Sequence, residues 1–209
     1  KQKTAYEIPK RDWSSDVCSS DLCVAVVQAA FPLAGTLSNN PAWLALARPA
    51  AGLQFGLLLI AFACLAASFL SNDFSVAYVA QHSNSLLPKP YQFAAVWGGH
   101  EGSYLLWLWL IYLWAVLTFS FSDHTLSTRA LWYALLIAAL MGAYLLFLSS
   151  PFTLFVPAGP DDGMDLNPLL QDPLMMIHPP ILYIGYVGFM IPMCYVLAYF
   201  HERQSRSEE

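Results

Sequence analysis

The sequence places one histidine where chemistry could occur at a membrane surface. His178 is followed by Pro179 and Pro180, and these residues separate a polar, proline-broken stretch at 166–173 from a long apolar run. Imidazole is the commonest metal ligand among side chains, and it titrates close to neutral pH. The residues alone leave two interpretations open: a metal ligand, or a histidine that anchors a helix end among lipid headgroups.

Asp172 and Pro173 precede this histidine in an arrangement typical of a helix start. An N-cap aspartate followed by proline at the first helical position favours a turn of helix, and residues 174–177 are all apolar. We therefore expect a short helical turn lying in the membrane interface. Because a proline disfavours the α conformation of the residue before it, we expect His178 to leave the helical ladder just before a membrane span begins.

A second group of candidate residues precedes another apolar run. It consists of His82, Trp97, His100 and Glu101, with glycines on both sides of the His100–Glu101 pair. Glu101 lies at a predicted helix start, where the positive end of the helix dipole favours a carboxylate, and the glycines allow close backbone approach. These features fit either a polar pocket for a bound group or a helix-capping turn, and the spacing favours the turn.

The elements that position these residues are membrane helices. The chain is 57% hydrophobic and 11% charged, with a mean hydropathy of +0.50, whereas soluble domains carry about 25% charged residues. An α-helix needs about 20 apolar residues to cross the hydrocarbon core. Four runs meet this requirement, and a shorter one looks like the remainder of a fifth span. We expect an all-α, polytopic transmembrane helical bundle of about five spans, the first truncated: Cys23–Leu33, Pro49–Leu70, Gly102–Phe121, Ala130–Ser150 and Pro179–Phe200.

Residues 1–22 differ in character from the rest of the chain. They are polar, and KQKTAYEI and RDWSSDVCSSDL resemble translated adaptor sequences of short-read sequencing. Such segments are excluded from reasoning about a fold. We expect residues 1–22 to be artefactual and residues 23–209 to form one membrane domain.

The basic residues predict the orientation of the spans. Loops on the cytoplasmic side carry an excess of lysine and arginine. With alternating spans, Lys89 falls on one side, and the loops Ser71–Glu101 and Pro151–His178 share that side, which is the periplasm in a bacterium. No basic stripe suits nucleic acid. The other side receives Arg48, Arg129, Arg203 and Arg206.

A resemblance to a known family covers essentially all of residues 23–200. The matching stretches resemble the CcmF/CycK/CcsA group of cytochrome c haem lyases, and within it the CcmF type. The resemblance implies a bacterial inner-membrane protein that receives haem from a periplasmic haem chaperone and promotes its attachment to apocytochrome c, together with thiol-handling subunits. The stretches are ALARPAAGLQFGLLLIAFACL at 45–65, DFSVAYVAQHSNSLLP at 73–88, AVWGGHEGSYLLW at 95–107 and LNPLLQDPLMMIHPPILYIGYVGF at 166–189.

The same resemblance assigns a role to His178. This residue falls on the histidine of the family's H-P-P motif, which is an axial ligand of haem iron during transfer. Trp97, His100, Glu101 and His82 lie in family motifs without an assigned ligand role, so they are weaker candidates for contact with haem. The family's tryptophan-rich haem-binding segment and its further haem ligands do not occur in residues 1–209. We therefore expect this chain alone to be inactive.

Two other functions fit a polytopic chain. A transport or channel subunit would need ionisable residues within its spans, and the four long runs contain no charged residue. A structural subunit of a membrane complex would use the outer loops as docking surfaces and would need no direct haem ligand. Only mutation separates this last alternative from the haem lyase.

Overall fold

Helices form almost all of the secondary structure. The computed structural model describes residues 46–119, 125–155 and 159–208. Within these ranges, strand-like pairing is limited to one antiparallel bridge between Val76 and Leu154, so the predicted all-α class is confirmed. The elements are α3 (Ala47–Leu70), α4 (Ala77–His82), α5 (Lys89–Ala94), the 3₁₀ turn η1 (Ala95–Trp97), α6 (His100–Phe119), α7 (Thr125–Leu148), the 3₁₀ turn η2 (Pro168–Leu170), α8 (Pro173–Gly188) and α9 (Met190–Glu208).

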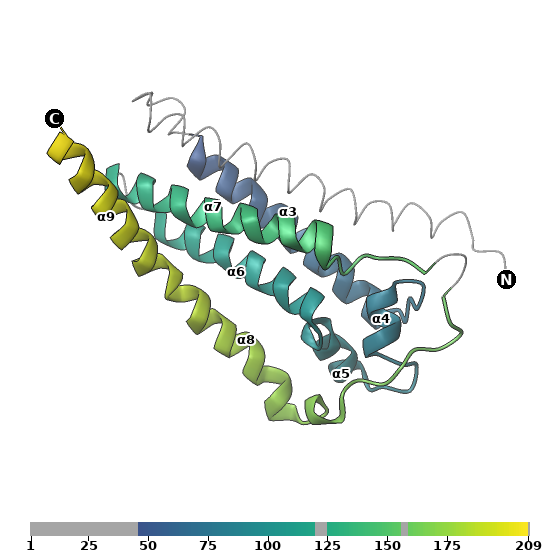
Figure 1. Ribbon diagram of the computed structural model, residues 1–209. Coiled ribbons are helices and arrows are strands. Elements are labelled where there is room, and N and C mark those ends of the chain that lie inside the picture. The colour runs from purple at the N-terminus through teal and green to yellow at the C-terminus, as the bar shows by residue number, and fades with distance from the viewer. Residues whose placement is uncertain (1–45, 120–124, 156–158, 209) are drawn as a thin grey trace.

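Four stretches are long and apolar enough to cross a membrane, and they correspond to the four predicted long spans. Helix α6 is central, because it packs against α3, α7 and α8, while α7 packs against α9. Figure 1 shows α8 and α9 running obliquely along this bundle. The predicted fifth run, residues 23–33, and the segment predicted to be artefactual, residues 1–22, lie outside the described residues. The four stretches are Ala47–Leu70, His100–Phe119, Leu126–Leu148 and Pro173–Arg203.

The last of these stretches is interrupted near its middle. Helix α8 ends at Gly188 and α9 begins at Met190. Pro192 has no N–H to donate to the Gly188 carbonyl four residues earlier, so the hydrogen-bond ladder cannot continue unbroken. The Phe189 N–H bonds back to the carbonyls of Gly185 and Tyr186, at 3.3 and 3.2 Å. The proline therefore accounts for the position of the break.

The start of α8 combines one confirmed prediction with one wrong one. The Asp172 carboxylate accepts hydrogen bonds from the N–H groups of Leu174 and Met175, at 2.8 and 3.2 Å, which is the predicted N-cap. The helix that begins there is not a separate interfacial turn, and His178 does not leave it, because α8 runs unbroken through Pro179 and Pro180. The local bias against helix before a proline is outweighed by the cap and by a tertiary hydrogen bond from Trp97 to the Met176 carbonyl.

The outer loops pack on one another at one end of the bundle. The N–H of Ala77 donates to the Thr153 carbonyl at 2.8 Å, and the N–H of Phe155 donates to the Ser75 carbonyl at 3.0 Å. Figure 1 shows α4, α5 and the start of α8 together at this end, away from the C-terminus. The described parts of loops 71–101 and 151–178 therefore lie at one end of the bundle.

Lys89 stabilises the end of α3. Its Nζ donates to the Leu70 carbonyl at 2.6 Å and to the Gln92 side chain at 2.9 Å. A cation is favourable at a helix C-terminus, because the carbonyls there lack intrahelical partners and carry the negative end of the dipole. The lysine predicted on the outer side therefore has a structural role at the base of the loops.

Candidate functional site at the outer end of the bundle

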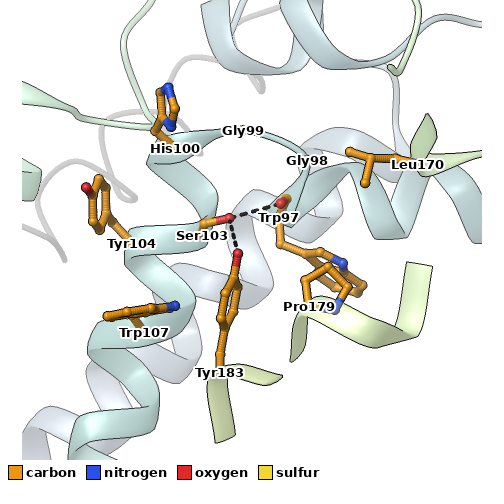
Figure 2. A pocket seen from close by; sticks show the side chains of 10 residues that line it. All are labelled: Trp97, Gly98, Gly99, His100, Ser103, Tyr104, Trp107, Leu170, Pro179 and Tyr183. Carbon is orange, nitrogen blue, oxygen red and sulfur yellow. Dashed lines mark hydrogen bonds between the residues drawn. The ribbon is translucent and has the colours of Figure 1, made fainter. Parts of the chain in front are cut away.

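A hollow of about 450 Å³ opens between the start of α6 and α8. Figure 2 shows its walls: the turn after η1 on one side, the first two turns of α6 on another, and α8 below. The lining residues are mostly aromatic or small, and they include one imidazole and three hydroxyl groups. They are Trp97, Gly98, Gly99, His100, Ser103, Tyr104, Trp107, Leu170, Pro179 and Tyr183.

The α6 wall of the hollow follows helical spacing. His100, Ser103, Tyr104 and Trp107 occupy positions i, i+3, i+4 and i+7, which lie on one face of an α-helix. From α8, Pro179 and Tyr183 are likewise four residues apart. Of the residues that line the hollow, Trp97 and His100 were predicted from the sequence, whereas Ser103, Tyr104, Trp107 and Tyr183 were not. The spacing was the signal that could have identified them.

A short chain of hydrogen bonds crosses the hollow. The Ser103 hydroxyl donates to the Trp97 carbonyl at 3.0 Å, and the Tyr183 hydroxyl donates to Ser103 Oγ at 3.4 Å (Figure 2). The Tyr183 ring also packs edge-on against Trp107, with centroids 5.5 Å apart. His100 is exposed at the rim. The hollow therefore combines aromatic walls with hydroxyl groups and an imidazole.

Behind this hollow, Tyr78 holds the glycine-rich turn. Its hydroxyl donates to the Val96 carbonyl at 3.0 Å and accepts from the Gly99 N–H at 2.9 Å. Burial raises the pKa of Tyr78, and the nearby Glu101 acts in the same direction. The phenol therefore stays protonated and keeps donating at any physiological pH.

His82 supports the same turn from α4. Its Nδ1 lies 3.0 Å from the Tyr78 carbonyl oxygen, and since a carbonyl only accepts, Nδ1 carries the proton. The Nε2 edge lies against Gly99, where an added Cβ would stand 2.5 Å from it. His82 thus packs behind the turn and does not line the hollow.

Glu101 also belongs to the turn. It lies in the first turn of α6, as the sequence predicted, and is half-buried toward Tyr78. It is absent from the lining of the hollow. Of the four weaker candidates, the structure thus brings Trp97 and His100 to the hollow and places Glu101 and His82 behind it.

His178 lies on a different face of α8. It is exposed, and it precedes Tyr183 by five positions, which is about 140° around a helix of 3.6 residues per turn. The residues one turn away on its own side, Leu174, Ile181 and Leu182, are 77%, 62% and 40% exposed. The imidazole therefore stands on an apolar outward face, while Pro179 beside it lines the hollow.

The neighbours of His178 along its helix face are mainly apolar. Among the residues that the structure describes, no three histidine, cysteine, aspartate or glutamate side chains gather into a metal site. Haem iron needs only one or two axial side chains from the protein. An exposed imidazole flanked by aliphatic side chains on one helix face offers a ligand together with apolar contacts for a porphyrin.

Comparisons with known proteins agree with each other. The family described as "Cytochrome C assembly protein" matches residues 97–209. The chain is similar to the cytochrome c-type biogenesis protein CcmF of Pseudomonas aeruginosa, with 46% identity over 85% of this chain and 27% of that protein. It is also similar to CcmF of Haemophilus influenzae, with 43% identity over 85% of this chain and 28% of that protein.

The fold also resembles that of a solved structure with a related name. The structure titled "Cytochrome c Heme Lyase CcmF" matches 93% of this chain and 31% of its own, with a TM-score of 0.80 and 25% sequence identity. The chain thus spans about 27% of the length of the curated relatives it matches.

Proposed function

Because this chain belongs to the cytochrome c assembly protein family, we propose that it is part of a membrane haem lyase that handles haem and promotes its attachment to apocytochrome c. The names of its relatives and of the structural neighbour support this function. In such a protein the reactive chemistry belongs to the haem, and the polypeptide supplies ligation and orientation.

His178 is the residue we assign to the haem iron. The observation that carries this assignment is an exposed imidazole on the apolar outward face of α8, at the end of the bundle where the outer loops gather. Leu174 and Ile181, one turn before and after it, would contact the porphyrin while the imidazole nitrogen reaches the iron. The H-P-P resemblance supports the same residue.

The hollow offers a second place for contact with the substrate. The His100 imidazole at its rim could donate to a carboxylate, such as a haem propionate or an acidic residue of a partner, whereas the hydroxyl protons of Ser103 and Tyr183 are already donated to the Trp97 carbonyl and to Ser103 Oγ. Trp97 provides an aromatic wall beside them. We assign these residues, and the supporting Glu101 and His82, a lesser role than His178.

The chain is a multi-pass membrane protein. We place it in a bacterial inner membrane, with the α4–α5 end in the periplasm. The distribution of basic residues supports this orientation: α7 and α9 carry Arg129 and Arg203 toward the opposite end. A periplasmic haem chaperone would then deliver haem to the outer end, and apocytochrome c with its thiol-handling subunits would approach from the same side. Lipid would cover the remaining apolar faces.

Replacement of His178 tests this function. In a protein that extends to the full length of its relatives, His178→Ala is expected to reduce the yield of holocytochrome c by about tenfold or more, because losing even a residue that only hydrogen-bonds to a metal ligand weakens a metal site by that factor. Membrane insertion should be unchanged, since the side chain is exposed. The yield is measured by haem staining of membranes and periplasm.

A histidine at the other end of the bundle provides the matched control. The Nδ1 atom of His201 lies 3.0 Å from the Tyr133 hydroxyl. Because this histidine lies at the end of the bundle opposite to the outer loops, His201→Ala should leave the yield near that of the wild type. A normal yield from His178→Ala would instead favour a structural subunit without a haem ligand in this region.

A further inference from the structure

Two consecutive prolines leave one carbonyl of α8 without a helical donor. A carbonyl at position i accepts from residue i+4 in an α-helix and from i+3 in a 3₁₀-helix. For Met176 these residues are Pro180 and Pro179, and neither has an N–H. Met175 differs, because the N–H of His178 remains available to it at i+3. The Met176 carbonyl therefore needs a donor from outside the helix.

Trp97 supplies that donor. Its Nε1–H donates to the Met176 carbonyl at 3.0 Å across 79 positions of sequence. The ring of a proline crowds the carbonyl four residues before it, so Pro180 directs the Met176 oxygen outward, where the indole meets it. This satisfies a partly buried polar group at the boundary of an apolar span, where water cannot readily replace the missing bond.

The indole is itself held in place. The Trp97 carbonyl accepts from Ser103 Oγ at 3.0 Å, and Phe93 packs edge-on against the Trp97 ring with centroids 5.2 Å apart. The ring stands between the hollow and a second, apolar cavity of about 300 Å³ that Pro180 and others line. The donor thus belongs to a side chain with contacts inside the bundle, whereas Val187 is the only buried residue of α8.

We propose that Trp97 is a positioning residue for His178. Its indole N–H takes the place of the N–H that Pro180 lacks, and it fixes the rotation and height of the α8 turn that carries the histidine. Met176 lies two residues before His178, so movement of its carbonyl would turn the imidazole with it. This role rests on the proposed function of His178 as a haem ligand.

A second tryptophan, which lies in α6, also donates to a carbonyl of α8 and provides a comparison for Trp97. Trp114 Nε1 donates to the Ile184 carbonyl at 3.1 Å. The residue four positions after Ile184 is Gly188, which has an N–H, so that carbonyl can also be served within the helix. If the Trp114 donor is lost, the Ile184 carbonyl can still accept from the Gly188 N–H. Trp114→Phe is therefore a matched control for Trp97→Phe.

The inference is tested by removing the indole donor to the Met176 carbonyl and then supplying a donor from within α8. In the protein at the full length of its relatives, purified in detergent, hydrogen exchange of the amides of residues 174–178 is measured for four variants. Trp97→Phe is expected to exchange about fivefold faster than the wild type, the factor that corresponds to one typical hydrogen bond. Adding Pro180→Ala supplies an N–H four residues after Met176, so the double variant should return to the wild-type rate. Trp114→Phe should differ little from the wild type, with or without Pro180→Ala.

A haem measurement then links the hydrogen bond to the ligand. The haem absorbance that depends on His178 should fall in Trp97→Phe and recover with Pro180→Ala. Unchanged exchange in Trp97→Phe, or failure of Pro180→Ala to restore it, would overturn the inference. The exchange data do not depend on haem. A His178→Ala variant that keeps full haem absorbance would therefore reject the ligand role separately.

Discussion

Gly102 occupies a position where no side chain fits. It lies in the first turn of α6, and an added Cβ would overlap the Val96 carbonyl and approach the Tyr78 hydroxyl to 2.7 Å. Gly142 in α7 offers a contrast, because a Cβ there would meet only Leu108 Cδ2 at an ordinary 3.7 Å. Close backbone approach thus explains why residue 102 must be glycine, and it gives no such reason for residue 142.

Alanine substitution should separate these two glycines. Gly102→Ala is expected to lower the free energy of unfolding by about 1–3 kcal/mol, the usual range for overpacking. Gly142→Ala should be neutral or stabilising by up to about 1 kcal/mol, since alanine favours a helix interior over glycine. Thermal unfolding in detergent measures both. Similar midpoints for the two variants would mean that the turn can shift to accept a side chain.

The candidate residues show which parts of a site a sequence can reveal. His100, Trp97 and His178 stood out because their chemistry is rare among apolar residues. Ser103 and Tyr183 did not, although helical spacing placed both on faces that could meet. The contact between Trp97 and Met176 could not be predicted, because nothing local indicates which distant donor reaches a given carbonyl.

A carboxylate joins two loops at the outer end of the bundle. Asp162 accepts from the hydroxyl and the N–H of Ser85, at 2.7 and 2.9 Å, and from the N–H of Gly163 at 2.8 Å. These bonds favour the charged form. The Ser85 hydroxyl is the largest cause that holds the pKa of Asp162 below its ordinary value of 3.8. The loop after α4 is thereby attached to the loop before η2.

The attachment should weaken in acid. Because the pKa of Asp162 is lower in the folded state than in the unfolded state, its contribution is complete above pH 3.8 and is lost as the pH falls through the lowered value. We expect the protection factors of the amides of residues 82–88 and 159–166, which correct for the intrinsic pH dependence of exchange, to fall over that acid range. Asp162→Asn should show faster exchange already near neutral pH.

The neighbouring aspartate provides the control for this prediction. Asp161→Asn makes the same change of charge one residue earlier, and it should leave exchange of both loops close to that of the wild type. Equal effects of the two substitutions would attribute the result to net charge rather than to the bonds with Ser85.

Helix α8 illustrates how tertiary contacts override local preference. The sequence correctly indicated its N-cap, since Asp172 and Pro173 act through their immediate neighbours. The expected break at His178 was wrong because a donor 79 residues away serves the carbonyl that the prolines leave open. The break that does occur, before Pro192, follows the ordinary rule that a proline removes the bond to the residue four positions earlier.

The bundle as a whole was the most predictable part of the protein. Composition and the length of apolar runs were enough to predict four spans, because a membrane helix must satisfy its own backbone and present about 20 apolar residues. The central place of α6 was not predictable. It depends on side-chain packing around buried residues such as Tyr112 and Leu105, which hydropathy does not describe.

The arrangement leaves α8 with two different faces. One face meets the hollow through Pro179 and Tyr183, and only Val187 of the helix is buried. The other face carries His178 among exposed apolar side chains. Helix α8 is thus attached to the bundle on one side and open on the other, so the face that carries His178 is accessible in the described part of the chain.

The most direct test of the ligand role of His178 is the visible absorption spectrum of the protein, expressed at the full length of its relatives together with a periplasmic haem chaperone. Wild-type protein should show a haem Soret band, His178→Ala should lose the chaperone-delivered part of it, and added imidazole should restore that part by replacing the missing ligand. Equal spectra for wild type and His178→Ala, without an effect of imidazole, would contradict the assignment of His178 as the haem ligand.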